Sequence, residues 1–206
     1  MVLITLEGID GTGKSTLVRL LEARLADVDP VFTREPTTAW TGEAVRRGIA
    51  EEVDPIAEAL LFAADHAAHI ATVVKPALAE GRLVVSDRYS DSRYAYQSVV
   101  LAGCIPNPLG WLKALHDGWT VPPDQTFLLV LGVGEAMRRI GTHDRREHFE
   151  TAEVLEKVHA AYIDLAEAEP SRFVLVDAEK EREEIASFVE GAIRATVERS
   201  RARRRP

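Results

Sequence analysis

Short runs of mostly apolar residues alternate along the chain with longer stretches in which apolar residues recur every three or four positions. The short runs lie at 2–6, 30–34, 83–86, 126–131 and 173–176. Brief apolar runs of this kind are typical of strands in parallel sheets, where both faces are buried. Five such strands alternating with helices predict an α/β fold, a parallel sheet with helices on both faces.

The helical spacing predicts where the covering helices lie. One of them has a marked start and end, because Asp54 precedes a proline at the first helical position and Gly81 follows the last turn. Pro76 is expected to interrupt this helix near Lys75, since proline lacks the N–H that a helix interior needs. A loop and a short helix are expected at 37–54. The remaining helices are expected at 17–25, 91–102, 111–115, 155–165 and 185–196.

The first strand leads into a glycine-rich loop that matches the phosphate-binding pattern G-x-x-x-x-G-K-[ST]. Gly8 and Gly13 are its glycines, Lys14 adds a positive charge, and the hydroxyl of Ser15 is a ligand for Mg²⁺. The helix that follows points its N-terminus at the bound anion. The alternative is a pair of glycines that only form a tight turn. Lys14 is expected at the helix start and outside the core.

Composition narrows the partners and the compartment. The 206 residues, 46% of them hydrophobic, suit one domain, and a net charge of −8 is expected to repel nucleic acid and anionic membranes. A small-molecule partner is therefore expected. The single Cys104 and the lack of a leader-like apolar start indicate the cytoplasm. The stretch 56–74 contains Glu58, Asp65, His66 and His69, so no membrane span is expected.

Charged residues follow two of the predicted strands. Arg34 ends the second, and Asp87 and Arg88 end the third. The carboxyl ends of parallel strands hold the ligand crevice, so Arg34 and Arg88 are candidates for a second anion and Asp87 for Mg²⁺. The alternatives are structural ion pairs, for Arg34 with Glu35.

Two helices present polar faces. Phe62, Asp65, His66 and His69 share one face of the helix that starts at Pro55, and its two histidines leave a zinc site as a minor alternative. On the helix at 91–102, Ser92 and Tyr96 lie one turn apart and are candidates for a pocket wall with Gln97.

The segment 135–150 is too polar for the core and is interrupted by Gly141. We expect it to be a mobile basic lid, which would neutralise transferring phosphates and exclude water. The alternative is a solvated helical hairpin. The basic end at 199–206 is expected to be a frayed tail. The arginines of the expected lid are Arg138, Arg139, Arg145 and Arg146.

These motifs in this order, GIDGTGKST, TREPT, LLFAADHAAH, DRYSDSRYAYQ and a basic lid, resemble thymidylate kinase over residues 2–177. REPT followed by DRREHFETAEVLEKV resembles the archaeal-type branch most. The resemblance implies a P-loop kinase fold with strand order 2-3-1-4-5 and a homodimer. It also implies transfer of the γ-phosphoryl of MgATP to dTMP.

The resemblance further implies roles for individual residues. Asp10 would meet the sugar 3′-hydroxyl, and Arg34 and Arg88 would bind the acceptor phosphate. Phe62 would stack on the base. Because Gly11 replaces the loop arginine of human-type enzymes, the catalytic arginine would come from the lid. The ATP-binding residues would be Gly8, Gly11, Thr12, Gly13, Lys14, Ser15 and Thr16, and Ser92, Tyr96 and Gln97 would complete the nucleoside pocket.

The chain departs from the family at His66, where the family has an arginine that hydrogen-bonds the thymine carbonyl. A neutral histidine is shorter and offers one donor and one acceptor, whereas arginine offers a fork of donors. We therefore expect His66 to change base selection. Two alternatives stay open, namely a kinase of the same fold for another nucleotide or natural-product intermediate, and a non-catalytic nucleotide-binding switch.

Overall fold

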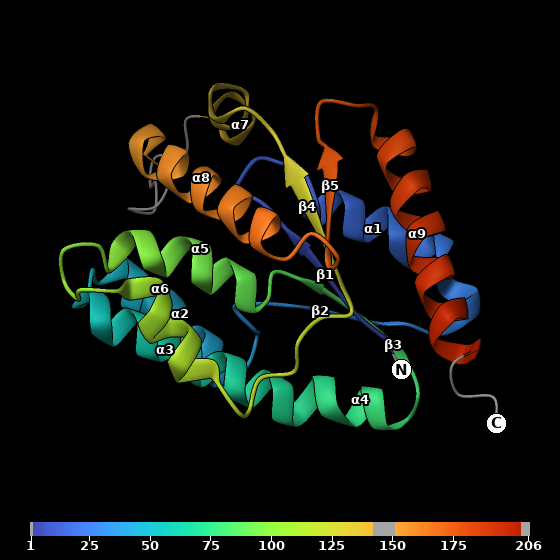
Figure 1. Cartoon of the computed structure of the whole chain (residues 1–206), viewed down its shortest axis with the longest axis horizontal. Coiled ribbons are helices and arrows are strands. Elements are labelled where there is room, and N and C mark those ends of the chain that lie inside the picture. The colour runs from blue at the N-terminus through green and yellow to red at the C-terminus, as the bar shows by residue number, and fades with distance from the viewer. Residues whose placement is uncertain (1, 142–150, 203–206) are drawn as a thin grey trace.

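The computed structural model describes residues 2–141 and 151–202 as one parallel sheet covered by helices (Figure 1). The strand order is β2-β3-β1-β4-β5, and each neighbouring pair is parallel. This confirms the predicted sheet and the strand order that the resemblance implied. The strands are β1 (Val2–Glu7), β2 (Val31–Arg34), β3 (Leu83–Asp87), β4 (Gln125–Val130) and β5 (Phe173–Asp177).

Helices cover both faces of the sheet. α1 and α9 pack together on one face, whereas α4, α5 and α8 lie on the other (Figure 1). β1 is buried at every position, which explains why it is mostly apolar, with Thr5 and Glu7 as its buried polar residues. The helices are α1 (Lys14–Arg24), α2 (Trp40–Ala50), α3 (Pro55–His69), α4 (Lys75–Ala79), α5 (Ser90–Val100), α6 (Pro108–His116), α7 (Val133–Ile140), α8 (Ala152–Ala168) and α9 (Arg182–Ala202), with a short 3₁₀ turn at Ala26–Val28.

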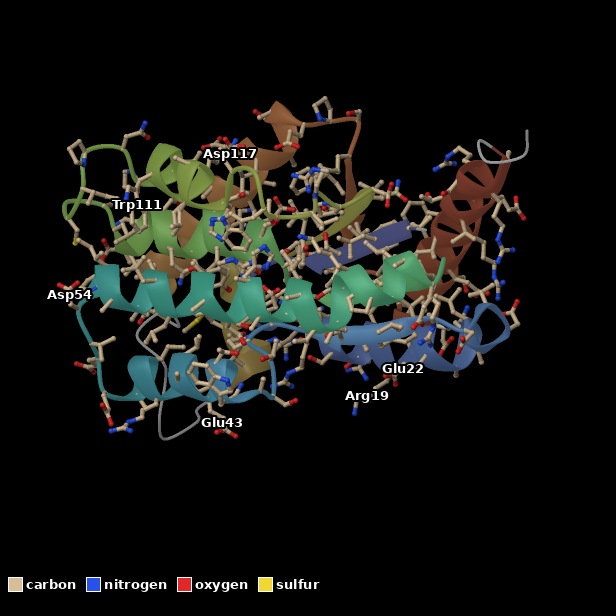
Figure 2. All side chains as sticks on the ribbon, turned by 90° about the horizontal axis from the view of Figure 1, so that it is seen from below. Arg19, Glu22, Glu43, Asp54, Trp111 and Asp117 are labelled. Carbon is tan, nitrogen blue, oxygen red and sulfur yellow. The ribbon has the colours of Figure 1, made fainter. Side chains whose placement is uncertain are left out.

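The long helix predicted at 55–81 forms as α3 and α4 joined by a π-helical segment, Ile70–Val74. Asp54 caps it by accepting from the amides of Ile56 and Ala57. The expected interruption comes just before Pro76, which has no N–H to donate to the preceding turn and lies in the first turn of α4. Figure 2 shows one continuous rod that begins at Asp54 and runs alongside α2, which carries the labelled Glu43.

This rod, Pro55–Ala79, has the length and the hydropathy of a membrane-spanning helix, and it is the only one that does within residues 2–141 and 151–202. Its polar side chains identify it as part of the α/β fold. Glu58, Asp65, His66 and His69 are all buried against the protein, not turned toward an outer surface. Ile70, Val74 and Leu78 pack beside Val84 of β3.

Candidate active site

The phosphate-binding loop connects β1 to α1, and Gly13 directly precedes the first helical residue with a left-handed backbone, φ 93°. The free amides of the first turn of α1 therefore face the cavity above the loop. Thr12 is buried and donates to the carbonyl of Ile9 at 2.9 Å, which fixes the shape of the loop. Gly8, Gly11, Ser15 and Thr16 complete the loop and the helix start as the sequence predicted.

Lys14 is buried, which differs from the expectation that it lies outside the core. Its Nζ donates to the carbonyls of Gly8 and Ile9, each at 2.9 Å. Burial, together with the nearby charge of Arg88, lowers the pKa of this ammonium to about 8. Lys14 therefore stabilises the loop through its own side chain.

Helix α7 packs directly on the loop at Gly11. A Cβ at this position would lie 2.4 Å from the carbonyl oxygen of Ala136, and the backbone has φ +83°. Only glycine fits both conditions. This contact explains physically why residue 11 of this chain has no side chain.

The same helix brings two of the expected lid arginines to the loop cavity. Arg138 and Arg139 both donate to Glu135, at 2.7 and 2.8 Å, and Arg139 also donates to the carbonyl of Ala178 at 3.0 Å. The first part of the expected lid, residues 135–140, therefore belongs to helix α7. Arg145 and Arg146 lie outside the described residues.

Ser15 and Asp87 meet across the loop, where the Ser15 hydroxyl donates to a carboxylate oxygen of Asp87 at 3.1 Å. A hydroxyl and a carboxylate are hard oxygen ligands of the kind that Mg²⁺ binds, so these two residues fit that ion. Within the described ranges no group of three His, Cys, Asp or Glu side chains could hold a metal, and His66 and His69 contact Glu35 instead.

Arg88 connects the loop to the helix that follows β3. Its backbone is left-handed at φ 67°, which is unusual for a residue other than glycine and is typical of functional sites. The guanidinium pairs with Asp10 and lies 5.0 Å from the ring centre of Tyr96. Burial raises the pKa of the Asp10 carboxyl, but the charges of Arg88 and Lys14 outweigh that effect and the pKa falls to about 2. Tyr96 also donates to Asp10, at 2.9 Å.

Two cavities join at this ion pair. The larger, which we call the loop cavity, has a volume of about 880 Å³ and contains the phosphate-binding loop and Asp87. The smaller, which we call the acceptor pocket, has a volume of about 200 Å³ and lies between α2, α3 and α5. Arg34 is exposed at the junction and has no ion-pair partner among the described residues, Glu35 included. The residues that line both are Asp10, Arg34, Glu35, Pro36 and Arg88.

The acceptor pocket contains four of the predicted nucleoside contacts, Phe62, Ser92, Tyr96 and Gln97. His66 is not among its lining residues, because its side chain is fully buried behind the pocket. There its Nδ1 lies 2.8 Å from Oε1 of Glu35 and its Nε2 lies 2.7 Å from the hydroxyl of Thr120. Whether His66 affects base selection stays a prediction, but any effect has to pass through its neighbours.

Glu35 is the centre of a buried cluster behind the acceptor pocket, formed with His66, His69, Arg93 and His116. Its Oε1 accepts from His69 Nδ1 at 2.6 Å, and its Oε2 pairs with Arg93. Burial by itself would raise the pKa of Glu35, but Arg93 and the two histidines hold it well below its usual range. The carboxylate is therefore ionised inside the protein and fixes the groups around it.

A second buried carboxylate, Glu7, lies beneath Arg88. It accepts from the amide of Tyr89 at 2.8 Å and from the hydroxyls of Ser92 and Tyr162 at 2.6 and 2.9 Å. Burial and the charge of Asp91 nevertheless raise its pKa to about 7. Glu7 thus joins β1, α5 and α8 directly under the ion pair of the site.

Sequence reasoning missed four residues that the structure brings to the site, namely Glu7, Glu35, Arg46 and Arg93. A charged residue at the end of a mostly apolar strand was a usable signal for Glu7. Arg93 is one helical turn before Gln97, so the same spacing argument that selected Ser92 and Tyr96 could have included it. Arg46 lies on α2, and no pattern in the sequence indicated that α2 faces the pocket.

Comparison with known proteins agrees with this geometry. A sequence model described as thymidylate kinase matches residues 6–189. A probable thymidylate kinase of Methanoculleus marisnigri is 60% identical over 204 residues, which cover 99% of this chain and 100% of that protein. Proteins with the same description from Methanocorpusculum labreanum and Natronomonas pharaonis are 54% and 47% identical, over 94% and 96% of this chain and 98% and 97% of their own lengths. These relatives are archaeal, in agreement with the branch that the motifs resemble.

Proposed function

The chain belongs to the thymidylate kinase family, and from that membership we propose that it transfers the γ-phosphoryl group of ATP to the 5′-phosphate of dTMP. A bond forms between an acceptor phosphate oxygen and Pγ, the bond from Pγ to the β,γ-bridging oxygen breaks, and the products are dTDP and ADP. The observation that carries this proposal is the junction of the loop cavity and the acceptor pocket at Arg34 and Arg88. Two anions brought there from opposite sides meet two guanidinium groups.

The loop residues bind the donor. In this proposal the amides of residues 11–16 cradle the β- and γ-phosphates, and Lys14 leaves the carbonyls of Gly8 and Ile9 to bind them. Ser15 and Asp87 would hold Mg²⁺, which when bound neutralises phosphate charge. Phosphoryl transfer asks mainly for alignment and charge neutralisation, so no general base is required.

The acceptor binds on the other side of Arg88. Asp10, already ionised by its ion pair with Arg88, would accept from the sugar 3′-hydroxyl. Tyr96 would lie against the deoxyribose and Phe62 against the base. Arg34, free of any ion pair with the described residues, would bind the acceptor phosphate together with Arg88.

The transferring phosphate carries its charge toward α7. Arg138 and Arg139 line the loop cavity, and in this proposal they leave Glu135 to neutralise that charge, with Arg145 and Arg146 as further candidates. We propose that 135–150 acts as the lid of a single-domain enzyme. The basic end at 199–206 is not frayed throughout, because residues 199–202 belong to α9.

We also propose a homodimer, because the chain belongs to the thymidylate kinase family. Light scattering on the purified protein tests it. Its nucleotide substrates support a cytoplasmic location.

A panel of acceptors tests the proposed reaction. Purified protein is mixed with MgATP and either no acceptor or one of dTMP, dUMP, dCMP, dGMP and dAMP, and ADP release is followed in a coupled assay. We expect release only with an acceptor and the highest kcat/KM with dTMP. The proposal would be contradicted if ADP were released at the same rate with and without an acceptor, or if no acceptor led to ADP release. Either result would favour a nucleotide-binding switch.

A further inference from the structure

Arg93 lies on α5, one turn before Gln97, and both side chains line the acceptor pocket. α5 packs against α3, α6 and α8 (Figure 1). The Arg93 side chain is only 3% exposed. It forms an ion pair with Glu35 through Nη1, and its Nε donates to His116 Nε2 at 3.3 Å. A guanidinium held on two sides by buried partners has a fixed position.

Arg93 has more donors than these partners use. A guanidinium carries five N–H groups. His66 Nδ1 lies 2.8 Å from both Glu35 Oε1 and Arg93 Nη2, but a ring nitrogen offers either a proton or a lone pair and so serves one of them. If His66 Nδ1 accepts from Arg93, then Nε, Nη1 and Nη2 of Arg93 each have one partner. One further N–H on Nη1 and one on Nη2 then have no acceptor among the described residues.

Gln97 shows the same deficit independently. Its Nε2 is buried and has no hydrogen-bond partner among the residues that the structure describes, although the residue is 1% exposed. Buried amide groups are nearly always hydrogen-bonded. Two donor groups one turn apart on α5, both lining the acceptor pocket, therefore indicate a ligand with acceptor oxygens.

The rest of the pocket indicates which part of the ligand this is. Phe62 contributes an aromatic face on which a planar ring can stack. Arg34 and Arg88, the proposed phosphate-binding arginines, line both cavities, whereas Arg93 and Gln97 line the acceptor pocket alone. The donors on α5 are therefore placed to meet a part of the acceptor other than its phosphate.

We propose that Arg93 recognises the acceptor base by donating hydrogen bonds to its 4-carbonyl oxygen, with Gln97 beside it, and that Glu35, His66 and His116 are positioning residues for its guanidinium. This rests on the proposed function and states how the site selects its base. A guanidinium has only donors, so it favours the carbonyl edge of thymine or uracil and disfavours the amino group of cytosine. The arginine that the family places at residue 66 is thereby replaced from a different helix.

The test is base discrimination in the full-length protein. We measure kcat/KM for dTMP, dUMP, dCMP and 4-thio-dTMP with saturating ATP, in the wild type and in Arg93→Lys. Lysine keeps the charge beside Glu35 but lacks the planar fork. We expect kcat/KM for dTMP to fall about 10- to 150-fold, the effect of one hydrogen bond to a charged group. The value for dCMP stays unchanged, and the preference for dTMP over 4-thio-dTMP, whose sulfur is a weaker acceptor, falls toward one.

Arg172→Lys is the matched control. Arg172 also pairs with a buried carboxylate on α5, that of Asp91, but it lines neither cavity. We expect this variant to keep the wild-type ratios between bases. Equal losses for all four acceptors in Arg93→Lys would show a structural role only and would overturn the inference.

Further outcomes distinguish a failure of the inference about Arg93 from a failure of the proposed function. If Arg93→Lys does not fold, as judged by its thermal unfolding, the wild type alone decides, because equal kcat/KM for dTMP and 4-thio-dTMP would refute recognition of the carbonyl. If the wild type phosphorylates dTMP but Arg93→Lys shows no selective loss, only this inference fails. If the wild type phosphorylates none of the acceptors, the proposed function fails with it.

Discussion

Replacing Gly11 by alanine tests the contact between the phosphate-binding loop and α7. The added Cβ would lie 2.4 Å from the carbonyl oxygen of Ala136, so either the loop or α7 has to move. The left-handed backbone at φ +83° costs a residue with a Cβ about 1–2 kcal/mol. Crowding a packed site costs about 1–3 kcal/mol more. We therefore expect Gly11→Ala to lower the free energy of unfolding by about 2–5 kcal/mol.

Gly81→Ala separates the two contributions, because Gly81 has φ +80° but no atom within 4 Å of its ideal Cβ. It has the same backbone cost and the same gain from a stiffer unfolded chain, but no overlap. In a chain of this size each kcal/mol shifts the Tm by about 2–4 °C. We expect calorimetry without nucleotide to show a clearly lower Tm for Gly11→Ala than for Gly81→Ala. Equal Tm values for the two variants would refute the close contact with α7.

Three further changes address charge in the site. Lys14→Ala should lower kcat by at least about 100-fold, the effect of removing one preorganised donor, and steady-state kinetics that retain turnover within about tenfold would contradict a phosphate role. Changing both Arg138 and Arg139 to alanine should lower kcat more than it raises the acceptor KM, since their charge is needed when phosphate charge redistributes, and an unchanged kcat would leave α7 as a surface helix. Glu7 has a pKa raised from 4.5 to about 7, so the stability it contributes is complete below pH 4.5 and is lost as pH rises through about 7. The Tm of the wild type relative to Glu7→Gln should therefore fall as pH rises across that window, and a Tm difference independent of pH would count against a protonated Glu7.

Much of the fold was predictable from the sequence because it depends on patterns a few residues long. The apolar runs placed all five strands within a residue or two of their observed limits, and Asp54 with Pro55 placed the start of α3. The π-helical segment was not predictable in the same way. Pro76 indicated an interruption. Whether the helix bends there or forms a wider π turn depends on how Ile70 and Val74 pack against β3.

The residues of the site also fall into a group that the sequence predicts and a group that it does not. Gly8, Lys14, Ser15 and Asp87 follow strand ends, and parallel topology alone brings strand ends to one edge of the sheet. Side chains that depend on how helices rotate against each other were not predictable. His66 and Arg93 lie on different helices, and only their packing decides which one faces the pocket.

The π-helical segment also sets the phase of the long helix. Each residue of an α-helix turns the chain by about 100°, so a turn with one extra residue rotates everything after it relative to everything before it. Upstream of Ile70, His66 and His69 face Glu35, and downstream of it Ala77 and Leu78 face the sheet. Removing one residue between Ile70 and Val74 would restore a regular helix and turn one of these two faces away from its partner. The single wide turn lets one helix serve both the buried cluster behind the pocket and the core under β3.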